Sequence, residues 1–120
     1  MIQIALVDDD EIMKLMLERA LRGVEGIELS YFMNPNEALI AFSKNSPDLL
    51  VLDVRMPLYD GDEFLNKLSE KCSLEKIKIV VASSIIAPKA IAEKFKKYHV
   101  QFAVKDELKT TLLQVLDEYN

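Results

Sequence analysis

The stretch Leu49-Leu50-Val51-Leu52-Asp53 decides the fold, because four apolar residues run without interruption into an acid. A strand that is apolar on both faces belongs inside a parallel sheet covered by helices on both sides. Residues 79–82, Ile79-Val80-Val81-Ala82, repeat the apolar run. The two runs therefore predict central strands of an α/β domain.

Strand-like runs alternate with segments of helical period along the whole chain. The predicted strands are residues 2–7, 27–32, 49–53, 77–82 and 100–105, and the predicted helices are residues 10–22, 34–42, 60–68, 87–98 and 106–119. Strict alternation predicts right-handed crossovers and a doubly wound α/β sheet with helices on both faces. One domain, residues 1–120, accounts for the chain, so we expect no output domain.

Composition narrows the classes of function. The 120 residues include 20 Asp and Glu against 15 Lys and Arg, a formal net charge of −5, which argues against nucleic acid or an anionic membrane as the main partner. The single cysteine, Cys72, excludes an internal disulfide and suits a reducing compartment. The start of the chain has no basic, apolar leader, and no apolar run is long enough to span a bilayer. We therefore expect a cytoplasmic protein.

Acidic residues follow two of the predicted strands. Asp8-Asp9-Asp10-Glu11 comes after the first strand and Asp53 ends the third. The carboxyl ends of parallel strands border the ligand crevice of such a sheet, so we expect these acids to converge there. Crowded carboxylates need a cation, and oxygen ligands with room for water and phosphate suit Mg²⁺.

Each acidic segment taken alone has a plainer interpretation, since acids at the start of a helix are stabilised by the helix dipole. The interpretation as a site gains from two further residues: Ser83 ends the fourth predicted strand and Lys105 ends the fifth. Chance alone is a poor explanation for acids, a hydroxyl and an ammonium group standing at the carboxyl ends of separate parallel strands.

With these residues in place, the sequence resembles the receiver domain of two-component response regulators, in particular the small chemotaxis-type receivers. The resemblance covers essentially the whole chain and is carried by Val7-Asp8-Asp9, by Asp53 with Met56-Pro57-Leu58-Tyr59-Asp60-Gly61, by Ser83-Ser84 and by Lys105. It implies a flavodoxin-like sheet of five parallel strands in the order 2-1-3-4-5.

The resemblance also implies a function. Asp53 would accept a phosphoryl group from the phosphohistidine of a sensor histidine kinase or a histidine phosphotransfer protein, in a two-component system or phosphorelay. Asp9, Asp53 and the backbone carbonyl of Arg55 would hold Mg²⁺ directly, and Asp8 would act through a water molecule. Such a protein catalyses only its own phosphorylation and dephosphorylation, and is not an enzyme acting on other substrates.

Two residues, Ser83 and Phe102, would turn phosphorylation into a change of shape. Ser83 and Lys105 would contact the phosphoryl group, and Phe102 stands where the family carries an aromatic residue that turns inward in the same step. The face formed by the fourth helix, fifth strand and fifth helix would then meet a downstream protein target.

The sequence departs from the family next to the lysine. Asp106 follows Lys105 where the family has a proline in a cis bond, and a cis bond before another residue type costs about 2.5–4 kcal/mol. The sequence leaves the conformation of this bond open. Two rivals follow: a receiver-like interaction module that is not phosphorylated, and a haloacid-dehalogenase-type enzyme, whose pattern needs an acid where this chain has Arg55.

The first predicted helix has more apolar residues than a core-facing helix needs. Its inward stripe is supplied by Met13, Met16, Leu17, Ala20 and Leu21, which leaves Ile12 and Leu15. We interpret Ile12 and Leu15 as a docking surface for a helical phosphodonor, with scattered surface apolar residues as the equally weighted alternative.

Overall fold

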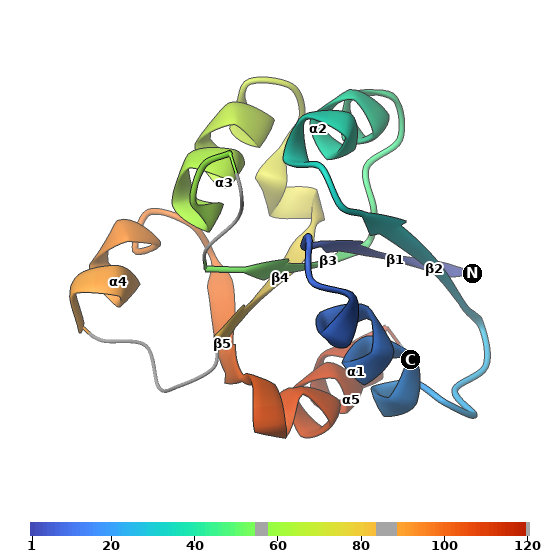
Figure 1. Cartoon of the computed structure of the whole chain (residues 1–120). Coiled ribbons are helices and arrows are strands. Elements are labelled where there is room, and N and C mark those ends of the chain that lie inside the picture. Colours follow the sequence, from blue (N-terminus) through green and yellow to red (C-terminus); the bar gives the residue numbers. More distant parts are fainter. Residues whose placement is uncertain (55–57, 84–88, 120) are drawn as a thin grey trace.

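The computed structural model describes residues 1–54, 58–83 and 89–119. Within these ranges the chain forms a parallel sheet of five strands in the order β2-β1-β3-β4-β5 (Figure 1). The strands are β1 (Ile2–Val7), β2 (Ile27–Phe32), β3 (Leu49–Asp53), β4 (Lys78–Ser83) and β5 (Val100–Val104). The predicted doubly wound topology and strand order are confirmed.

Helices cover both faces of the sheet. They are α1 (Glu11–Ala20), α2 (Pro35–Lys44), α3 (Gly61–Ser69), α4 (Lys89–Lys94) and α5 (Leu108–Asp117), with short 3₁₀ turns at Leu74–Lys76 and Lys105–Glu107. One apolar core joins α1 and α5 to one face of the sheet, and a second joins α2 and α3 to the other. Leu49 to Leu52 are fully buried, as a run apolar on both faces requires.

Local sequence explains where two helices begin. The side chain of Asp10 accepts a hydrogen bond from the Ile12 amide at 2.9 Å and caps α1. Asn34 does the same for α2 through the Asn36 amide at 2.8 Å, with Pro35 in the first helical position. Satisfied amides at a helix start stabilise the entry into each helix.

Several predicted boundaries were wrong by one or more residues. The first helix ends at Ala20 and not at Arg22, because the chain turns through residues 21–23 and Gly23 adopts φ +82°. β4 begins one residue later than predicted, after the 3₁₀ turn, and β5 ends one residue earlier. The second helix extends two residues further, to Lys44. The predicted start of the fourth helix, at Ala87 and Pro88, lies outside the described residues.

The amino end of the sheet is tied together around Asp48. Its carboxylate accepts a hydrogen bond from the Gln3 amide at 2.7 Å. Its carbonyl oxygen accepts from the Lys78 amide at 2.9 Å and from the Tyr119 hydroxyl at 2.7 Å. One residue thus connects β1, β4 and the end of the chain.

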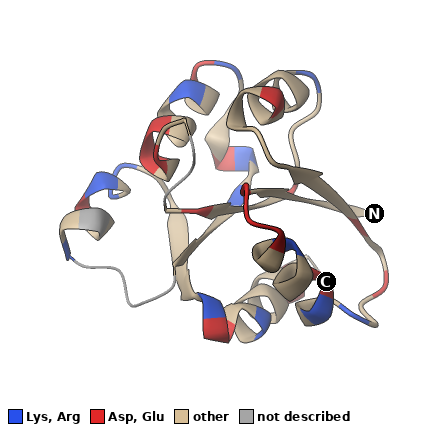
Figure 2. Ribbon diagram, viewed as in Figure 1, with Lys and Arg blue, Asp and Glu red and all other residues tan. Residues whose placement is uncertain are grey.

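Charge is distributed unevenly over this fold. Residues 1–64 contain 13 acids and 5 bases, whereas residues 65–120 contain 7 acids and 10 bases. Figure 2 shows acidic residues along the segment that leads from β1 into α1, and basic residues on α4. None of the described helices has the length and apolar character needed to cross a membrane.

Candidate functional site

Asp53 and Lys105 meet at the carboxyl end of the sheet. Asp53 ends β3, and Lys105 follows β5. The Lys105 Nζ donates to an Asp53 carboxylate oxygen at 3.2 Å, and both side chains are 18% exposed. A charge pair that is largely withdrawn from water is held more firmly than an exposed pair. The predicted approach of these two residues is therefore present in the structure.

Ser83 lies beside the pair through the register of the strands. Asp53 stands opposite Ala82 of β4, and Ser83 stands opposite Val104 of β5. Ser83 thus follows Ala82, the residue paired with Asp53, and is itself paired with Val104, the residue before Lys105. The sequence prediction that these three side chains come from neighbouring strand ends is consistent with this register.

Asp8 is the most deeply buried acid of the site, with 5% of its surface exposed. One carboxylate oxygen accepts a hydrogen bond from the Asp10 amide at 3.0 Å. The other, Oδ2, is buried and has no hydrogen-bond partner among the described residues. Burying a carboxylate oxygen without a hydrogen bond costs free energy of folding. A bound cation would offset this cost at Asp8 Oδ2.

Burial raises the pKa of the Asp8 carboxyl from 3.8 to about 7. The Asp10 amide hydrogen bond opposes this rise, and so does the positive charge of Lys105. The negative charges of Asp53 and Asp9 add to it. The two carboxylates at the ends of β1 and β3 are therefore close enough to repel each other, as the topology predicts.

Asp9 is exposed and contributes less to the enclosed part of the site. Across the described ranges, no group of three or more His, Cys, Asp or Glu side chains is arranged to hold a metal ion. The predicted convergence of Asp8, Asp9 and Asp53 on one ion is therefore not present as a preformed cluster. Arg55, the predicted carbonyl ligand, lies outside the described residues.

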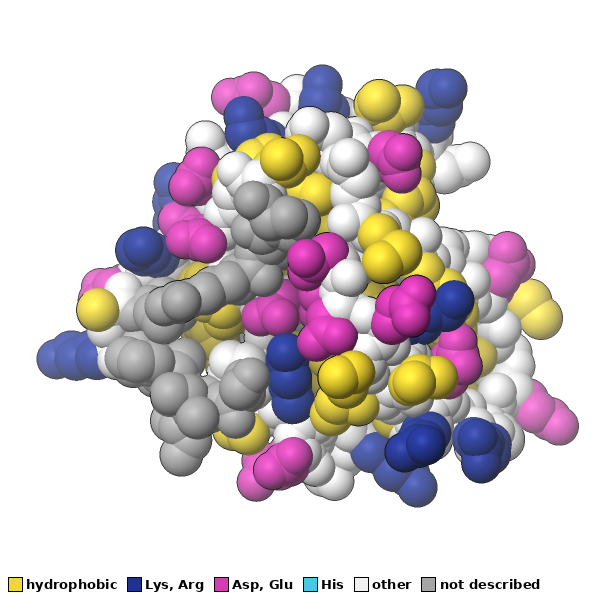
Figure 3. Space-filling view, in the orientation of Figure 1, with side chains coloured by type: hydrophobic (Ala, Val, Ile, Leu, Met, Phe, Trp, Pro, Cys, Tyr) yellow, Lys and Arg dark blue, Asp and Glu magenta, His cyan; other side chains and the backbone are white. Residues whose placement is uncertain are grey.

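The donor chemistry nevertheless suits Mg²⁺. The Oδ2 of Asp8, which has no hydrogen-bond partner in the described part of the chain, and the Asp53 carboxylate are hard oxygen ligands, and the two groups interact electrostatically. Figure 3 shows acidic side chains gathered in the middle of this face, with basic and apolar side chains around them. Asp53 pairs with Lys105 in the structure, so a cation and the ammonium group would share its negative charge.

Gly61 packs against the residues of the site, although the sequence alone assigned it no role. A Cβ at this position would lie 2.6 Å from a Leu52 methyl carbon and 2.7 Å from the Asp53 carbonyl oxygen. The Gly61 amide donates to the Val54 carbonyl at 2.9 Å. Only glycine allows the start of α3 to approach the end of β3 this closely. Its place in the quoted motif was the available signal.

The other predicted residues have clear positions. Ile12 and Leu15 are 64% and 51% exposed on α1, whereas Met13 and Leu17 are fully buried, so the division of this helix into two sets is confirmed. Phe102 is partly buried and packs against the same apolar core as α2 and α3. The described residues contain no cis peptide bond, so the Lys105–Asp106 bond is trans.

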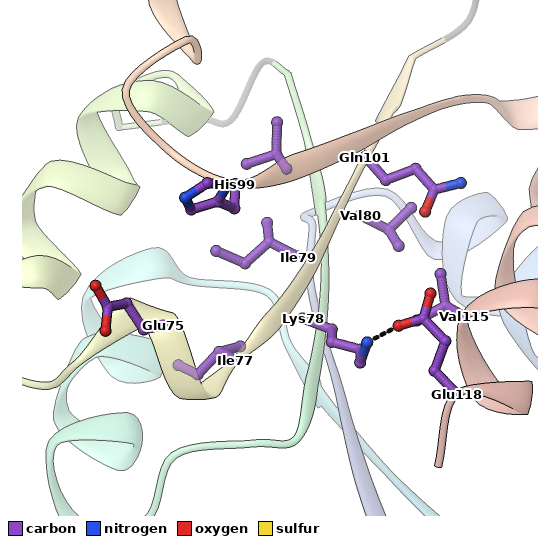
Figure 4. Close-up of a pocket in the computed structure, with 10 residues that line it drawn as sticks. Glu75, Ile77, Lys78, Ile79, Val80, His99, Gln101, Val115 and Glu118 are labelled. Carbon is purple, nitrogen blue, oxygen red and sulfur yellow. Dashed lines mark ion pairs between the residues drawn. The ribbon is translucent and has the colours of Figure 1, made fainter. Parts of the chain in front are cut away.

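A hollow of about 370 Å³ lies at the opposite end of the sheet (Figure 4). Glu75, His99 and Gln101 line it, and Lys78 and Glu118 form an ion pair across its side. It opens beside the amino ends of β4 and β5, away from Asp53 and Lys105. Asp53, Ser83 and Lys105 therefore lie at the carboxyl end of the sheet and not at this hollow.

Comparison with known proteins supports the assignment of the fold and the family. The family model of the response regulator receiver domain matches residues 4–117. The DNA-binding transcriptional regulator NtrC of Salmonella typhimurium is 38% identical over 79 residues, which are 66% of this chain and 17% of that protein. A protein-glutamate methylesterase/protein-glutamine glutaminase of Hahella chejuensis is 40% identical over 68 residues, 56% of this chain and 18% of that protein.

Solved structures share the fold. Chemotaxis protein CheY4 of Vibrio cholerae has a TM-score of 0.81 at 24% identity, with 98% of each chain covered. The response regulator domain of Thermotoga maritima CheB has a TM-score of 0.78 at 18% identity and covers 98% of this chain and 94% of that one. The chain spans less than a fifth of the curated relatives just described. On the family match over residues 4–117, the chain belongs to the response regulator receiver domain family.

Proposed function

We propose that Asp53 accepts a phosphoryl group from a phosphohistidine and that the chain acts as a switch for protein partners. The contact that supports this proposal most directly is the Lys105–Asp53 pair at 3.2 Å, next to the buried Asp8. Three charged groups from separate strand ends have no structural need to meet unless the crevice handles an ionic ligand.

The transfer needs little from the protein beyond alignment and neutralisation of charge. A carboxylate oxygen of Asp53 would form a bond to phosphorus while the bond from phosphorus to the histidine nitrogen breaks, and the departing imidazole would take up a proton to become neutral. Lys105 would move from the Asp53 carboxylate to a phosphoryl oxygen. Ser83 would donate its hydroxyl to another.

We assign the magnesium ligands to Asp8, Asp9, Asp53 and the backbone carbonyl of Arg55. When bound, Mg²⁺ supplies positive charge to the phosphoryl oxygens and to the crowded carboxylates. Asp8 contributes the buried oxygen that has no protein partner among the described residues, and Asp53 contributes the carboxylate that also reacts.

The proposed partners are a sensor histidine kinase or a histidine phosphotransfer protein upstream and a protein target downstream. The target would bind the face formed by α4, β5 and α5, where Phe102 lies. We also propose a cytoplasmic location, which suits the single free thiol of Cys72.

The test is to incubate the chain with Mg²⁺ and acetyl phosphate and to measure the mass gain of one phosphoryl group. Asp53→Asn should abolish the gain, while the matched control Asp62→Asn, at a half-buried position of α3, should retain it. A wild-type chain that gains no phosphoryl group under these conditions, and also fails to bind beryllofluoride, would be a receiver-like interaction module that is not phosphorylated.

A further inference from the structure

Phe95, the residue that follows α4, anchors this part of the chain. Its side chain is 1% exposed, and among the described side chains of residues 89–99 it alone is fully buried. Lys89, Ala90, Glu93 and Lys94 of α4 are exposed. The position of α4, at the β5 side of the molecule in Figure 1, therefore depends strongly on where the Phe95 ring sits.

One side of the Phe95 ring lies against Gly61 at the start of α3, next to the end of β3. A Cβ placed on Gly61 would be 3.3 Å from the Phe95 ring carbon Cζ and 2.7 Å from the Asp53 carbonyl oxygen. The ring, the start of α3 and the backbone of Asp53 therefore meet at one point without spare volume. A shift of the Asp53 backbone changes the space that is open to Phe95.

The other side of the ring reaches β5. Phe95 and Phe102 pack edge to face, with ring centroids 5.5 Å apart and an interplanar angle of 89°. Lys105 follows the same strand three residues later and pairs with Asp53. The contacts thus form a closed circuit. It leads from Asp53 to Gly61, Phe95, Phe102 and Lys105 and back to Asp53.

We propose that Phe95 is the positioning residue that couples the charge pair of the site to α4. Loss or displacement of the Lys105–Asp53 contact frees the ends of β3 and β5 at once. The aromatic ring of Phe95 then shifts, because it packs against Gly61 beside β3 and against Phe102 of β5. α4 then moves with its anchor. The biological use of this coupling rests on the proposed phosphoryl transfer, but the coupling itself exists in the unphosphorylated chain.

The experiment is a double-mutant cycle read by amide hydrogen exchange of residues 89–94. Lys105→Met breaks the pair with Asp53, and Phe95→Leu removes the aromatic contact while keeping an apolar side chain. We expect Lys105→Met to change the exchange of α4 by about fivefold or more in the wild-type background, and by less than about twofold in the Phe95→Leu background.

Phe42→Leu is the matched control, because Phe42 is also buried and makes edge-to-face contacts, but with Phe32 and Phe64. In this background the response of α4 to Lys105→Met should persist at full size. An equal response in the Phe95→Leu and Phe42→Leu backgrounds, or no response of α4 to Lys105→Met in the wild type, would overturn the proposal.

Phosphorylation is then tested separately, so that the two proposals can fail independently. A wild-type chain that takes no phosphoryl group refutes the proposed function and leaves the result of the cycle standing. A chain that is phosphorylated at Asp53, with an α4 response that is unchanged by Phe95→Leu, refutes the role of Phe95 alone.

Discussion

The ammonium group of Lys105 lies 3.2 Å from a carboxylate oxygen of Asp53, although 52 positions separate the two residues in the chain. The contact joins the ends of β3 and β5, strands that are not neighbours in the sheet. It bridges β4 and so holds the Lys105 side chain over the crevice. The same side chain lowers the pKa of Asp8, so one cation influences both acids.

Replacing this lysine should impair phosphorylation. We expect Lys105→Met to slow the acceptance of a phosphoryl group from acetyl phosphate by about 100-fold, because a fixed positive group opposite the developing charge is lost. The rate of mass gain measures it. Lys109→Met, on an exposed position of α5, should react at the wild-type rate; equal slowing in both variants would contradict a specific role for Lys105.

Stability should fall as pH rises through the range in which Asp8 ionises. The folded-state pKa of about 7 lies above the ordinary value of 3.8, so the folded chain holds a proton that the unfolded chain releases. The stabilisation is complete below about pH 4 and is lost as pH rises through about 7. Asp8→Asn should therefore raise the free energy of unfolding at pH 8, by an amount of the order of a few kcal/mol.

Urea denaturation at pH 5 and pH 8 measures this effect. The pH dependence should flatten in Asp8→Asn and persist in Asp117→Asn, a control on an exposed position of α5. Added Mg²⁺ should stabilise the wild-type chain at pH 8, since it binds the ionised carboxylates. A pH profile that Asp8→Asn leaves unaltered would rule out Asp8 as its source.

A methyl group at position 61 should destabilise the fold and disturb the acceptor. We expect Gly61→Ala to lower the free energy of unfolding by about 1–3 kcal/mol, because the new carbon would overlap Leu52 and the Asp53 carbonyl. Gly23→Ala, which meets no atom within 4 Å but requires φ +82°, should cost about 1–2 kcal/mol through backbone strain alone. Only Gly61→Ala should also slow phosphorylation of Asp53.

The exposed apolar residues of α1 should matter for a protein donor and not for a small one. Replacing both Ile12 and Leu15 by Ser should slow phosphoryl transfer from the cognate phosphohistidine protein and leave transfer from acetyl phosphate unchanged. Ile40→Ser, at a residue 60% exposed on α2, is the control. Equal slowing with both donors would show that the double variant damages the site itself.

Tyr98 offers a test of an unsatisfied group. Its hydroxyl is buried and has no hydrogen-bond partner in the described part of the chain, so Tyr98→Phe should be neutral or raise the free energy of unfolding by about 1–2 kcal/mol. Tyr59→Phe should lower it by about 1 kcal/mol, because the Tyr59 hydroxyl donates to Asn36 at 2.8 Å. Urea denaturation should therefore show a loss of stability in Tyr59→Phe and none in Tyr98→Phe.

Sequence reasoning predicted the elements that depend on local patterns. The bounds of β1, β2 and β3 are as predicted, since each is a short segment rich in apolar and branched residues that ends at an acid or before a turn. The end of α1 was wrong because Leu21 continues the apolar period and is buried, although the backbone has already left the helix there. Periodicity records burial and not backbone hydrogen bonding.

The site was predictable in its membership and not in its geometry. Strand ends at one edge of the sheet indicated Asp53, Ser83 and Lys105, because topology alone brings them together. The burial of Asp8 and the close approach of Gly61 depend on the packing of several elements at once. No local pattern around Phe95 indicates that it touches both α3 and β5.

The hydrogen bonds around Asp48 have a consequence for how such a sequence can change over generations. They join β1, β4 and Tyr119 at the end of the sheet opposite to Asp53 and Lys105. Substitutions at that end would alter thermal resistance while sparing signalling, and substitutions at Gly61 or Phe95 would alter signalling along with folding. Selection can therefore adjust the thermal stability of this domain and its signalling through separate sets of residues.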